Sequence, residues 1–370
     1  MGDETEENPL NGVHFVAGTP NAYIQEPGLL RTAGEWIARY GKRIFIVTGT
    51  KSWNQAGEAL SQSLDEAEVA YEVAPYRGEC SYAEVARLQE LVGPGVELIV
   101  GVGAGKVIDT AKKLSNDMNI PLVTIPTLAA QCAAVTNLSV MYTDEGVYVD
   151  FPVFYRNSLL TLVDTELLAA APVRYLVAGI GDTIAKWYEA TASATGKPHN
   201  LPTIGGLQAA KLCFDTLIAH SKQAVADARE GKASDALAQV IDAVILFSGI
   251  VGGLGEDNCR SAAAHAVHNG LTAIPDTHHA YHGEKVAYGI LVQLALENRP
   301  TAEIAELLDF YKEIGLPLKL RELGIERELT PQDWDNMAKV ALSPDGTMGN
   351  MPFAVTEESV IEAIRRVELW

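Results

Sequence analysis

The first half of the chain alternates short β-branched runs with helix-like stretches. Three runs rich in Val and Ile have the length and composition of strands: residues 43–50, 96–106 and 121–130. Between them, residues 82–91 and 107–116 carry apolar side chains at the spacing of an amphipathic helix. This alternation predicts a parallel sheet with helices on both faces, and such sheets bind ligands at the carboxyl ends of their strands.

From about Thr165 the pattern changes to long segments rich in Ala, Leu and Glu, whose apolar positions follow the 3.6-residue period of a helix. With 370 residues the chain exceeds the size, about 250 residues, at which a single core usually stops growing. We therefore predict an α/β domain over residues 1–162, an all-α domain over residues 163–370, and a cleft between them.

Composition and charge narrow the class of protein. No run of about 18 uninterrupted apolar residues is present, as a membrane-spanning helix would need. The chain begins MGDETEENPLNG, which is acidic where a signal peptide is basic and then apolar, so we predict a cytoplasmic location. A net charge of −20 argues against nucleic acid and anionic membranes as partners. The four cysteines form no CxxC pair and are predicted to be reduced thiols: Cys80, Cys132, Cys213 and Cys259.

A glycine-rich turn follows the second predicted strand, in the sequence VGVGAGKVIDTAK (residues 100–112). Glycines at 101, 103 and 105 let the backbone approach a pyrophosphate, and the amides of the following helix start are donors for it. A tight connection between strand and helix explains the glycines equally well. The turn has neither the GxGxxG order in a first βα unit nor the Gly-Lys-Ser/Thr of a P-loop.

The end of the earlier strand bears on which nucleotide binds. It reads Gly49, Thr50, Lys51, with no carboxylate to repel a 2′-phosphate. This favours NADP slightly over NAD. A plain turn with a solvated lysine is the alternative.

Five of the eight histidines fall within residues 265–282. His265 and His268 are three apart and share one face of a helix. His282 follows a loop that contains a proline and directly precedes a glycine, where a helix could begin. This arrangement favours a metal site, whereas structural roles fit His278 and His279 better.

A metal also needs a charge-balancing ligand, and Asp182 stands between a predicted glycine turn and an apolar helix. The alternative role for this aspartate is a helix N-cap. Two histidines and a carboxylate suit Zn²⁺ or Fe²⁺, and also Ni²⁺ or Mn²⁺, and three protein ligands leave a position open for substrate.

Five segments resemble, in order and spacing, the iron-containing alcohol dehydrogenase superfamily, glycerol dehydrogenase branch: GVGAGKVIDTAK, IPTLAAQCAAVTNLSVMY, APVRYLVAGIGDTIAKWYEA, AAAHAVHNGLTAIP and HGEKVAYGILVQ. The resemblance covers roughly residues 13–300. It implies the dehydroquinate synthase-like fold of that superfamily, with a Rossmann-like N-terminal domain and a helical C-terminal domain. It also implies an NAD(P)-linked enzyme with one divalent metal and a small-molecule substrate, which we expect to be a homo-oligomer.

Carried over residue by residue, the resemblance places the metal ligands on Asp182, His265 and His282. The three-glycine turn of the family corresponds to Gly103-Ala104-Gly105. The residues expected to bind the nucleotide are Gly49, Lys51, Gly103, Ala104, Gly105, Lys106, Asp109, Thr127, Ala130, Thr136, Leu138 and Tyr142.

Two positions depart from the family and concern the substrate. Glycerol dehydrogenases carry an Asp that contacts the polyol where this chain has Cys132, which puts glycerol in doubt. Lys186 lies one helical turn after Asp182, and a cation so near a metal is costly unless an anion lies between them. We predict that Lys186 holds a substrate carboxylate. The alternative is a side chain that reaches solvent or pairs with a carboxylate such as Glu189.

The predicted activity is therefore hydride transfer between a nicotinamide nucleotide and small 2-oxo or 2-hydroxy acids, which resembles the hydroxycarboxylate dehydrogenases of this branch. The catalytic residues would be Lys186 and His268, the latter to relay a proton or shape the pocket. The alternatives are a glycerol or other polyol dehydrogenase, a lyase related to dehydroquinate synthase, and a non-enzymatic binding protein. The lyase would need several basic residues near the metal, and only Lys186 is a candidate.

Overall fold

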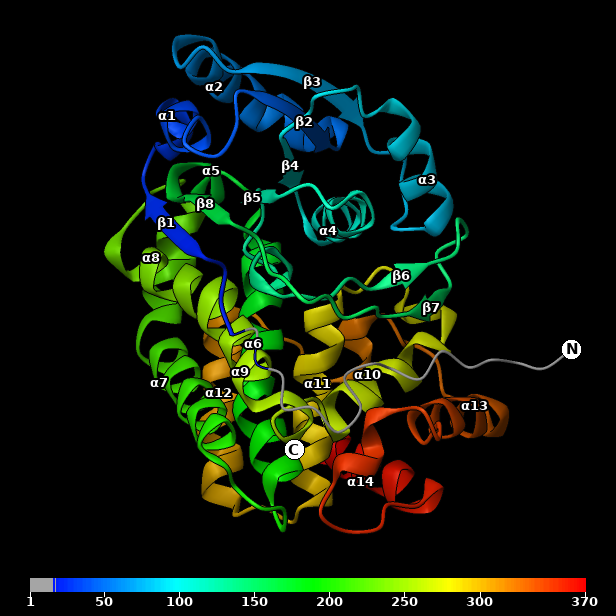
Figure 1. Ribbon diagram of the computed structural model, residues 1–370. Helices are drawn as coiled ribbons and strands as arrows, with labels where there is room; N and C mark the ends of the chain where they lie inside the picture. Colours follow the sequence, from blue (N-terminus) through cyan, green and yellow to red (C-terminus); the bar gives the residue numbers. More distant parts are fainter. Residues whose placement is uncertain (1–15, 17) are drawn as a thin grey trace, which may run out of the picture.

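The computed structural model describes residues 16 and 18–370. A parallel sheet of six strands occupies the upper part of the molecule in Figure 1, above a body of helices. Its order is β1-β8-β5-β4-β2-β3, and every neighbouring pair is parallel. The strands are β1 (Ala22–Glu26), β2 (Arg43–Thr48), β3 (Ala70–Pro75), β4 (Leu98–Gly103), β5 (Leu122–Pro126) and β8 (Leu160–Asp164).

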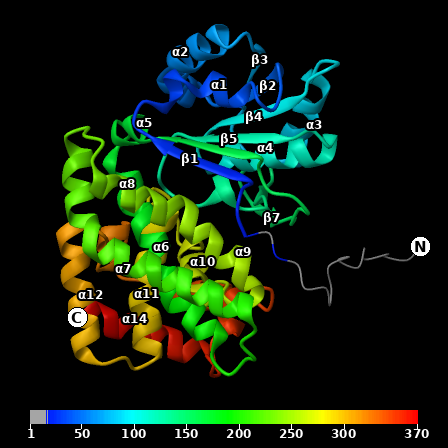
Figure 2. The same cartoon turned by 60° about the vertical axis from the view of Figure 1, so that its left-hand side comes forward.

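Helices cover both faces of this sheet, as predicted. Along β2, Ile44 and Ile46 pack into the apolar cluster on one face, whereas Phe45 and Val47 pack into the cluster on the other. Such double-sided burial explains the nearly continuous apolar runs in the sequence. Figure 2 shows α1 and α2 above the sheet and α4 below it. These helices are α1 (Ala33–Ile37), α2 (Thr50–Glu66), α3 (Tyr82–Leu91) and α4 (Gly105–Met118).

In the described part of the chain, the remaining regular elements are helices, apart from a two-stranded antiparallel ribbon, β6 (Met141–Tyr142) and β7 (Tyr148–Asp150). Most of these helices pack around a third, larger apolar cluster. They are α5 (Thr165–Ala169), α6 (Val173–Ala194), α7 (Leu201–Arg229), α8 (Asp235–Asp242), α9 (Ser248–Gly255), α10 (Ala263–Thr272), α11 (His282–Leu296), α12 (Thr301–Ile314), α13 (Pro331–Ala341) and α14 (Glu357–Leu369).

One helical stretch, Asp235–Asn258, joins α8 and α9 through a π-helical turn at Ala243–Phe247. Among the described residues it is the one stretch long and apolar enough, by length and composition, to cross a membrane. Half of its apolar window is buried inside the molecule, and core helices pass the same test. The stretch is therefore weak evidence for a membrane span.

The sheet continues into the position of the predicted domain boundary, because β8 ends at Asp164. The buried carboxylate of Asp164 accepts hydrogen bonds from the backbone N–H groups of Gly28 (2.8 Å), Leu30 (2.9 Å) and Glu166 (2.9 Å). It thus joins the chain after β1 to the start of α5. The division at residues 162 and 163 stays a prediction.

A buried ion pair fixes the chain after β5 onto α4. Lys112 Nζ lies 2.7 Å from Asp109 Oδ1 and donates to Thr136 Oγ1 (3.1 Å) and to the carbonyl of Leu138. The backbone N–H of Val140 donates to the other oxygen of Asp109 (3.1 Å). Burial raises the pKa of Asp109 despite the opposing effect of Lys112. Each charge of the pair is therefore stable in this place only because of its partner.

Replacing Lys112 by Met is expected to lower the free energy of unfolding by about 3–5 kcal/mol, because it leaves the Asp109 carboxylate buried without its counter-ion. Denaturant unfolding measures the change. Adding Asp109→Asn to Lys112→Met is expected to recover part of it. The control is Lys339→Met in the exposed pair with Asp335 (2.7 Å), which should leave stability nearly unchanged. If Lys112→Met were as stable as Lys339→Met, the structural role of the buried pair would be contradicted.

Candidate metal and nucleotide site

Asp182 lies in the middle of α6 and not at a helix start, so the predicted glycine turn before it is wrong. Gly179 and Gly181 are helical residues that permit close packing. A Cβ on Gly181 would lie 2.7 Å from the carbonyl oxygen of Gly283, and a Cβ on Gly283 would lie 1.8 Å from that of Ala178. The backbones of α6 and α11 are therefore in direct contact next to Asp182 and His282.

A second close crossing brings in the third residue. A Cβ on Gly289 of α11 would lie 2.2 Å from the carbonyl oxygen of Ala264 in α10, the residue before His265. As predicted, His265 lies on a helix and α11 begins at His282. Three helices, α6, α10 and α11, thus each contribute one side chain to the same point.

The three side chains form a group that fits a divalent metal. The Nε2 atoms of His265 and His282 each lie 3.3 Å from Asp182 Oδ1, and ligand atoms of all three residues lie within 4.8 Å of one another. This Oδ1 is buried, and it has no hydrogen-bond partner of good geometry among the described residues. A buried carboxylate oxygen without a donor is costly unless a cation lies beside it. Two imidazoles and one carboxylate are ligands that Zn²⁺ and Fe²⁺ accept.

The charges in this group are set by its neighbours. Burial alone would raise the pKa of Asp182, but Lys186 and the two histidines outweigh burial and hold it well below its ordinary value. Burial alone would lower the pKa of His265, but the carboxylates of Glu189 and Asp182 raise it to about 9. Asp182 is therefore an anion. The side chain of His282 is half exposed, which leaves the group open to solvent on that side.

His268 contacts the group through His282. Its Nε2 lies 3.0 Å from His282 Nδ1, and its Nδ1 lies 2.9 Å from Asn269 Oδ1. Burial, together with the neighbouring His282 and His265, lowers the pKa of His268 well below 6.5, so the ring is neutral. Its predicted catalytic role stays a prediction. His278 instead contacts the carbonyl of Thr272 (3.2 Å), apart from the three ligand candidates.

The predicted phosphate cradle lies at the carboxyl ends of β2, β4 and β5. Gly103 ends β4, and a Cβ there would lie 2.7 Å from the Cβ of Val107, so only glycine permits this turn. The residue before α4, Ala104, makes no side-chain cap, which leaves the first N–H groups of the helix available to an anion. Thr127 is beside it, since its N–H donates to the Gly103 carbonyl (3.1 Å).

The other predicted nucleotide residues divide into two sets. Gly49 and Lys51 stand at the start of α2, close to the cradle, where Ser52 Oγ lies 3.2 Å from Thr127 Oγ1. A second set has side chains or carbonyls engaged within the protein. Lys106 pairs with Glu79 (2.6 Å) and lies over the Tyr142 ring, and Asp109, Thr136 and Leu138 contact Lys112. Their assignment to the nucleotide stays a prediction.

Gln131 is a residue of the site that the sequence does not predict, and its amide lies over the start of α4. A Cβ on Gly105 would lie 1.5 Å from Gln131 Nε2, so the glycine makes room for this side chain. Gln131 Oε1 also accepts from the N–H of Ala133 (3.2 Å). A single amide in a loop follows no periodic pattern, and its proximity to the cradle comes only from the fold.

The segment from Thr127 to Thr136 connects the cradle to the metal ligands. A Cβ on Gly179 of α6 would lie 2.3 Å from the carbonyl oxygen of Ala129, and a Cβ on Gly249 of α9 would lie 2.4 Å from Val135 Cγ2. Ala130, predicted to bind the nucleotide, thus lies against α6 one turn before Asp182. The sheet edge and the helical body meet at this segment.

Lys186 lies one turn after Asp182 and is partly exposed. Burial alone would lower its pKa, but the Asp182 carboxylate outweighs burial and raises it, so the side chain is an ammonium. Over residues 16 and 18–370, no hydrogen bond or ion pair engages this ammonium, and the alternative partner Glu189 contacts His265 instead.

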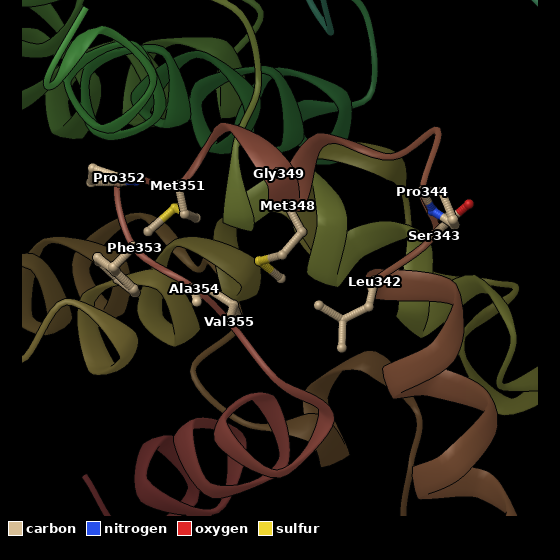
Figure 3. Close-up of a pocket in the computed structure, with 10 residues that line it drawn as sticks. All are labelled: Leu342, Ser343, Pro344, Met348, Gly349, Met351, Pro352, Phe353, Ala354 and Val355. Carbon is tan, nitrogen blue, oxygen red and sulfur yellow. The ribbon is translucent and has the colours of Figure 1, made fainter.

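A separate hollow of about 520 Å³ lies in residues 342–355, between α13 and α14. Figure 3 shows its lining, which includes Met348, Met351 and Phe353 and none of the predicted site residues. The same segment supports the start of α10, because Thr347 Oγ1 donates to the Ala262 carbonyl (2.7 Å).

Comparison with known proteins agrees with this geometry. A family model for iron-containing alcohol dehydrogenases matches residues 20–165. A glycerol dehydrogenase of Citrobacter freundii is 36% identical over 96% of this chain and 97% of its own length. The chain belongs to the iron-containing alcohol dehydrogenase family.

Other family members extend the similarity. Hydroxycarboxylate dehydrogenase A of Escherichia coli K12 is 36% identical over 97% of this chain and 99% of its own length. The crystal structure of glycerol dehydrogenase from Schizosaccharomyces pombe has a TM-score of 0.88 at 31% identity, and covers 96% of this chain and 91% of that one. The predicted family, fold class and enzyme class are confirmed, so the chain is an oxidoreductase. The cytoplasmic location, the excluded partners and the homo-oligomer stay predictions.

Gly283→Ala tests whether the helix crossing maintains the ligand geometry. The new Cβ would collide with the Ala178 carbonyl, so α6 and α11 must separate, with a loss of about 1–3 kcal/mol in stability. The affinity for Zn²⁺ should fall at least about tenfold, because Asp182 and His282 move apart. Competition with a chelator measures it. The control is Gly252→Ala, where a Cβ meets nothing within 4 Å. A Gly283→Ala variant that binds Zn²⁺ like the wild type would contradict this role.

Proposed function

We propose that this enzyme interconverts small 2-oxo acids and 2-hydroxy acids, with NAD(P) as the hydride carrier and one divalent metal held by Asp182, His265 and His282. The observation that supports the substrate class is the ammonium of Lys186. It lies one turn from Asp182, is charged, and has no partner in the described part of the chain (16 and 18–370). An ammonium in this position suits a substrate carboxylate.

Different residues of this chain bind the substrate, bind the nucleotide and relay a proton. A divalent metal, when bound, acts as a Lewis acid toward the carbonyl or hydroxyl oxygen of the substrate. Lys186 binds the carboxylate one bond away from the reacting carbon and so fixes which face of the substrate meets the nucleotide. The first N–H groups of α4 hold the nucleotide phosphates. His268, whose ring is neutral, stands next to His282 as a proton relay.

The names of the relatives support a small hydroxyl- or oxo-bearing substrate and leave two candidate substrates. Hydroxycarboxylate dehydrogenase A favours the 2-oxo acid, whereas several relatives are named glycerol dehydrogenases, and glycerol is therefore the second candidate. Cys132 argues against it, because a thiol replaces the carboxylate that contacts the polyol in the glycerol dehydrogenases this chain resembles.

A steady-state screen tests the proposal directly. NADH and NADPH are each offered with 2-oxo acids, uncharged ketones and aldehydes, and NAD and NADP with glycerol and simple alcohols. The enzyme is reconstituted separately with Zn²⁺, Fe²⁺, Ni²⁺ and Mn²⁺. We expect the highest kcat/KM with a 2-oxo acid, and a slight preference for NADPH because no carboxylate follows β2. Turnover of glycerol without turnover of any 2-oxo acid would overturn the proposal.

Lys186→Met tests the carboxylate contact. We expect kcat/KM for 2-oxobutyrate to fall about 10- to 100-fold, the effect of losing a charged hydrogen bond of about 1.5–3 kcal/mol. The value for butanone, which has no carboxylate, should change less than about threefold, since Met keeps the length of the side chain. An equal loss on both substrates would show that Lys186 does not recognise the carboxylate.

Cys132→Asp tests the second substrate position. A carboxylate there would satisfy the charge of Lys186 and repel the substrate carboxylate, so activity on 2-oxobutyrate should fall about tenfold or more. Activity on glycerol should rise. Cys132→Ser is the control, because it changes the atom without adding charge. If Cys132→Asp and Cys132→Ser behave alike in steady-state assays of both substrates, charge at this position does not select the substrate.

A further inference from the structure

Glu189 is a buried carboxylate on α6, 1% exposed and two turns after Asp182. Both of its oxygens are engaged by α10 and the residue before it. Oε1 accepts from the backbone N–H groups of Ala262 (2.7 Å) and His265 (2.9 Å), and Oε2 lies 2.6 Å from His265 Nδ1. The carboxylate thus joins α6 to α10 through two backbone N–H groups and one imidazole nitrogen.

The hydrogen bonds of Oε1 cap the N-terminal end of α10. Ala262 precedes α10 and makes no side-chain cap of its own. The Glu189 carboxylate, which comes from a different helix, supplies the missing acceptor at the N-terminal end, where a negative charge is also favoured. This oxygen therefore fixes the position of α10.

The contact of Oε2 has a different consequence. A carboxylate only accepts hydrogen bonds, so the hydrogen between the two groups is carried by Nδ1 of His265. The other ring nitrogen, Nε2, faces Asp182 Oδ1 at 3.3 Å. A metal requires the lone pair of a ring nitrogen, and the hydrogen bond on Nδ1 reserves Nε2 for it.

We propose that Glu189 is the positioning residue of the metal site, which fixes both the orientation of the His265 ring and the nitrogen that binds the metal. This inference rests on the proposed metal role of Asp182, His265 and His282. The other histidine is held differently, because His282 Nδ1 faces the neutral ring of His268 (3.0 Å) and not a carboxylate. Among the described residues, Glu189 is the carboxylate that contacts Nδ1 of His265, whereas Asp182 faces Nε2.

Glu189→Gln separates the two contacts. The amide oxygen can still accept from the N–H groups of Ala262 and His265, and the helix cap persists. The amide nitrogen, however, is a donor and meets His265 Nδ1, which must then act as an acceptor. The ring hydrogen moves to Nε2, the atom that the metal needs. A role limited to capping α10 predicts no such effect.

The experiment measures the dissociation constant for Zn²⁺ by chelator competition on the full-length protein. Glu189→Gln is expected to raise it about 10- to 100-fold, the range found when partners of metal-binding histidines are lost. The melting temperature of the metal-free protein is recorded beside it and shows that each variant is folded. Glu189→Asp, which keeps an acceptor, should recover part of the affinity lost in the Gln variant.

Two controls decide the interpretation. Thr347→Val removes a hydrogen bond at the same end of α10 without contact to the imidazole, and should leave Zn²⁺ affinity unchanged. In a His265→Ala background, Glu189→Gln should cause no further loss, because its target is absent. Wild-type affinity in Glu189→Gln, or an equal loss with and without His265, would overturn the inference. A wild-type protein that binds no divalent metal would overturn the proposed function itself, which is a different result.

Discussion

The site depends on the contact of two helix backbones, α6 and α11, at Gly181 and Gly283. Each glycine is the immediate neighbour of a ligand candidate, Asp182 in one helix and His282 in the other. Because these glycines have no Cβ atoms, the two helices come close enough for the backbone carbonyls of each to contact a glycine of the other. Only at that separation do short side chains such as Asp and His share a metal. The helix crossing therefore determines the geometry of the site before any metal is bound.

A second constraint joins this crossing to the sheet. The chain after β5 packs against α6 at Gly179 and against α9 at Gly249, while the buried Asp109 and Lys112 pair holds its continuation to α4. The cradle at the start of α4 and the metal ligands consequently have a fixed relative position. Hydride transfer between two bound molecules needs such a fixed distance, since small displacements are costly in rate.

The sequence predicts those parts of the fold that depend on local burial. β2, β4 and β5 have both faces covered and stand out in the sequence as apolar runs, whereas β1 and β3 are edge strands with polar residues and were not predicted. The buried strand β8, which ends at the predicted domain boundary, was not predicted either. The glycines before Asp182 have the local pattern of a turn, because the contact that favours them in a helix is with a distant residue, Gly283. The contacts of Glu189 with α10 and of Gln131 with α4 were not predicted for the same reason. Their contacts join segments that no local pattern relates.

Charge balance connects the site to its substrate. Asp182 and Glu189 are both anions, and together they offset the two positive charges of a divalent metal bound between neutral histidines. Lys186 is then one positive charge in excess, partly buried and close to Asp182. A neutral polyol would leave that charge uncompensated, whereas the single carboxylate of the proposed 2-oxo acid would neutralise it. Under the proposed function, the carboxylate of the substrate would be the partner of Lys186, which would account for a charged residue one turn from a metal ligand.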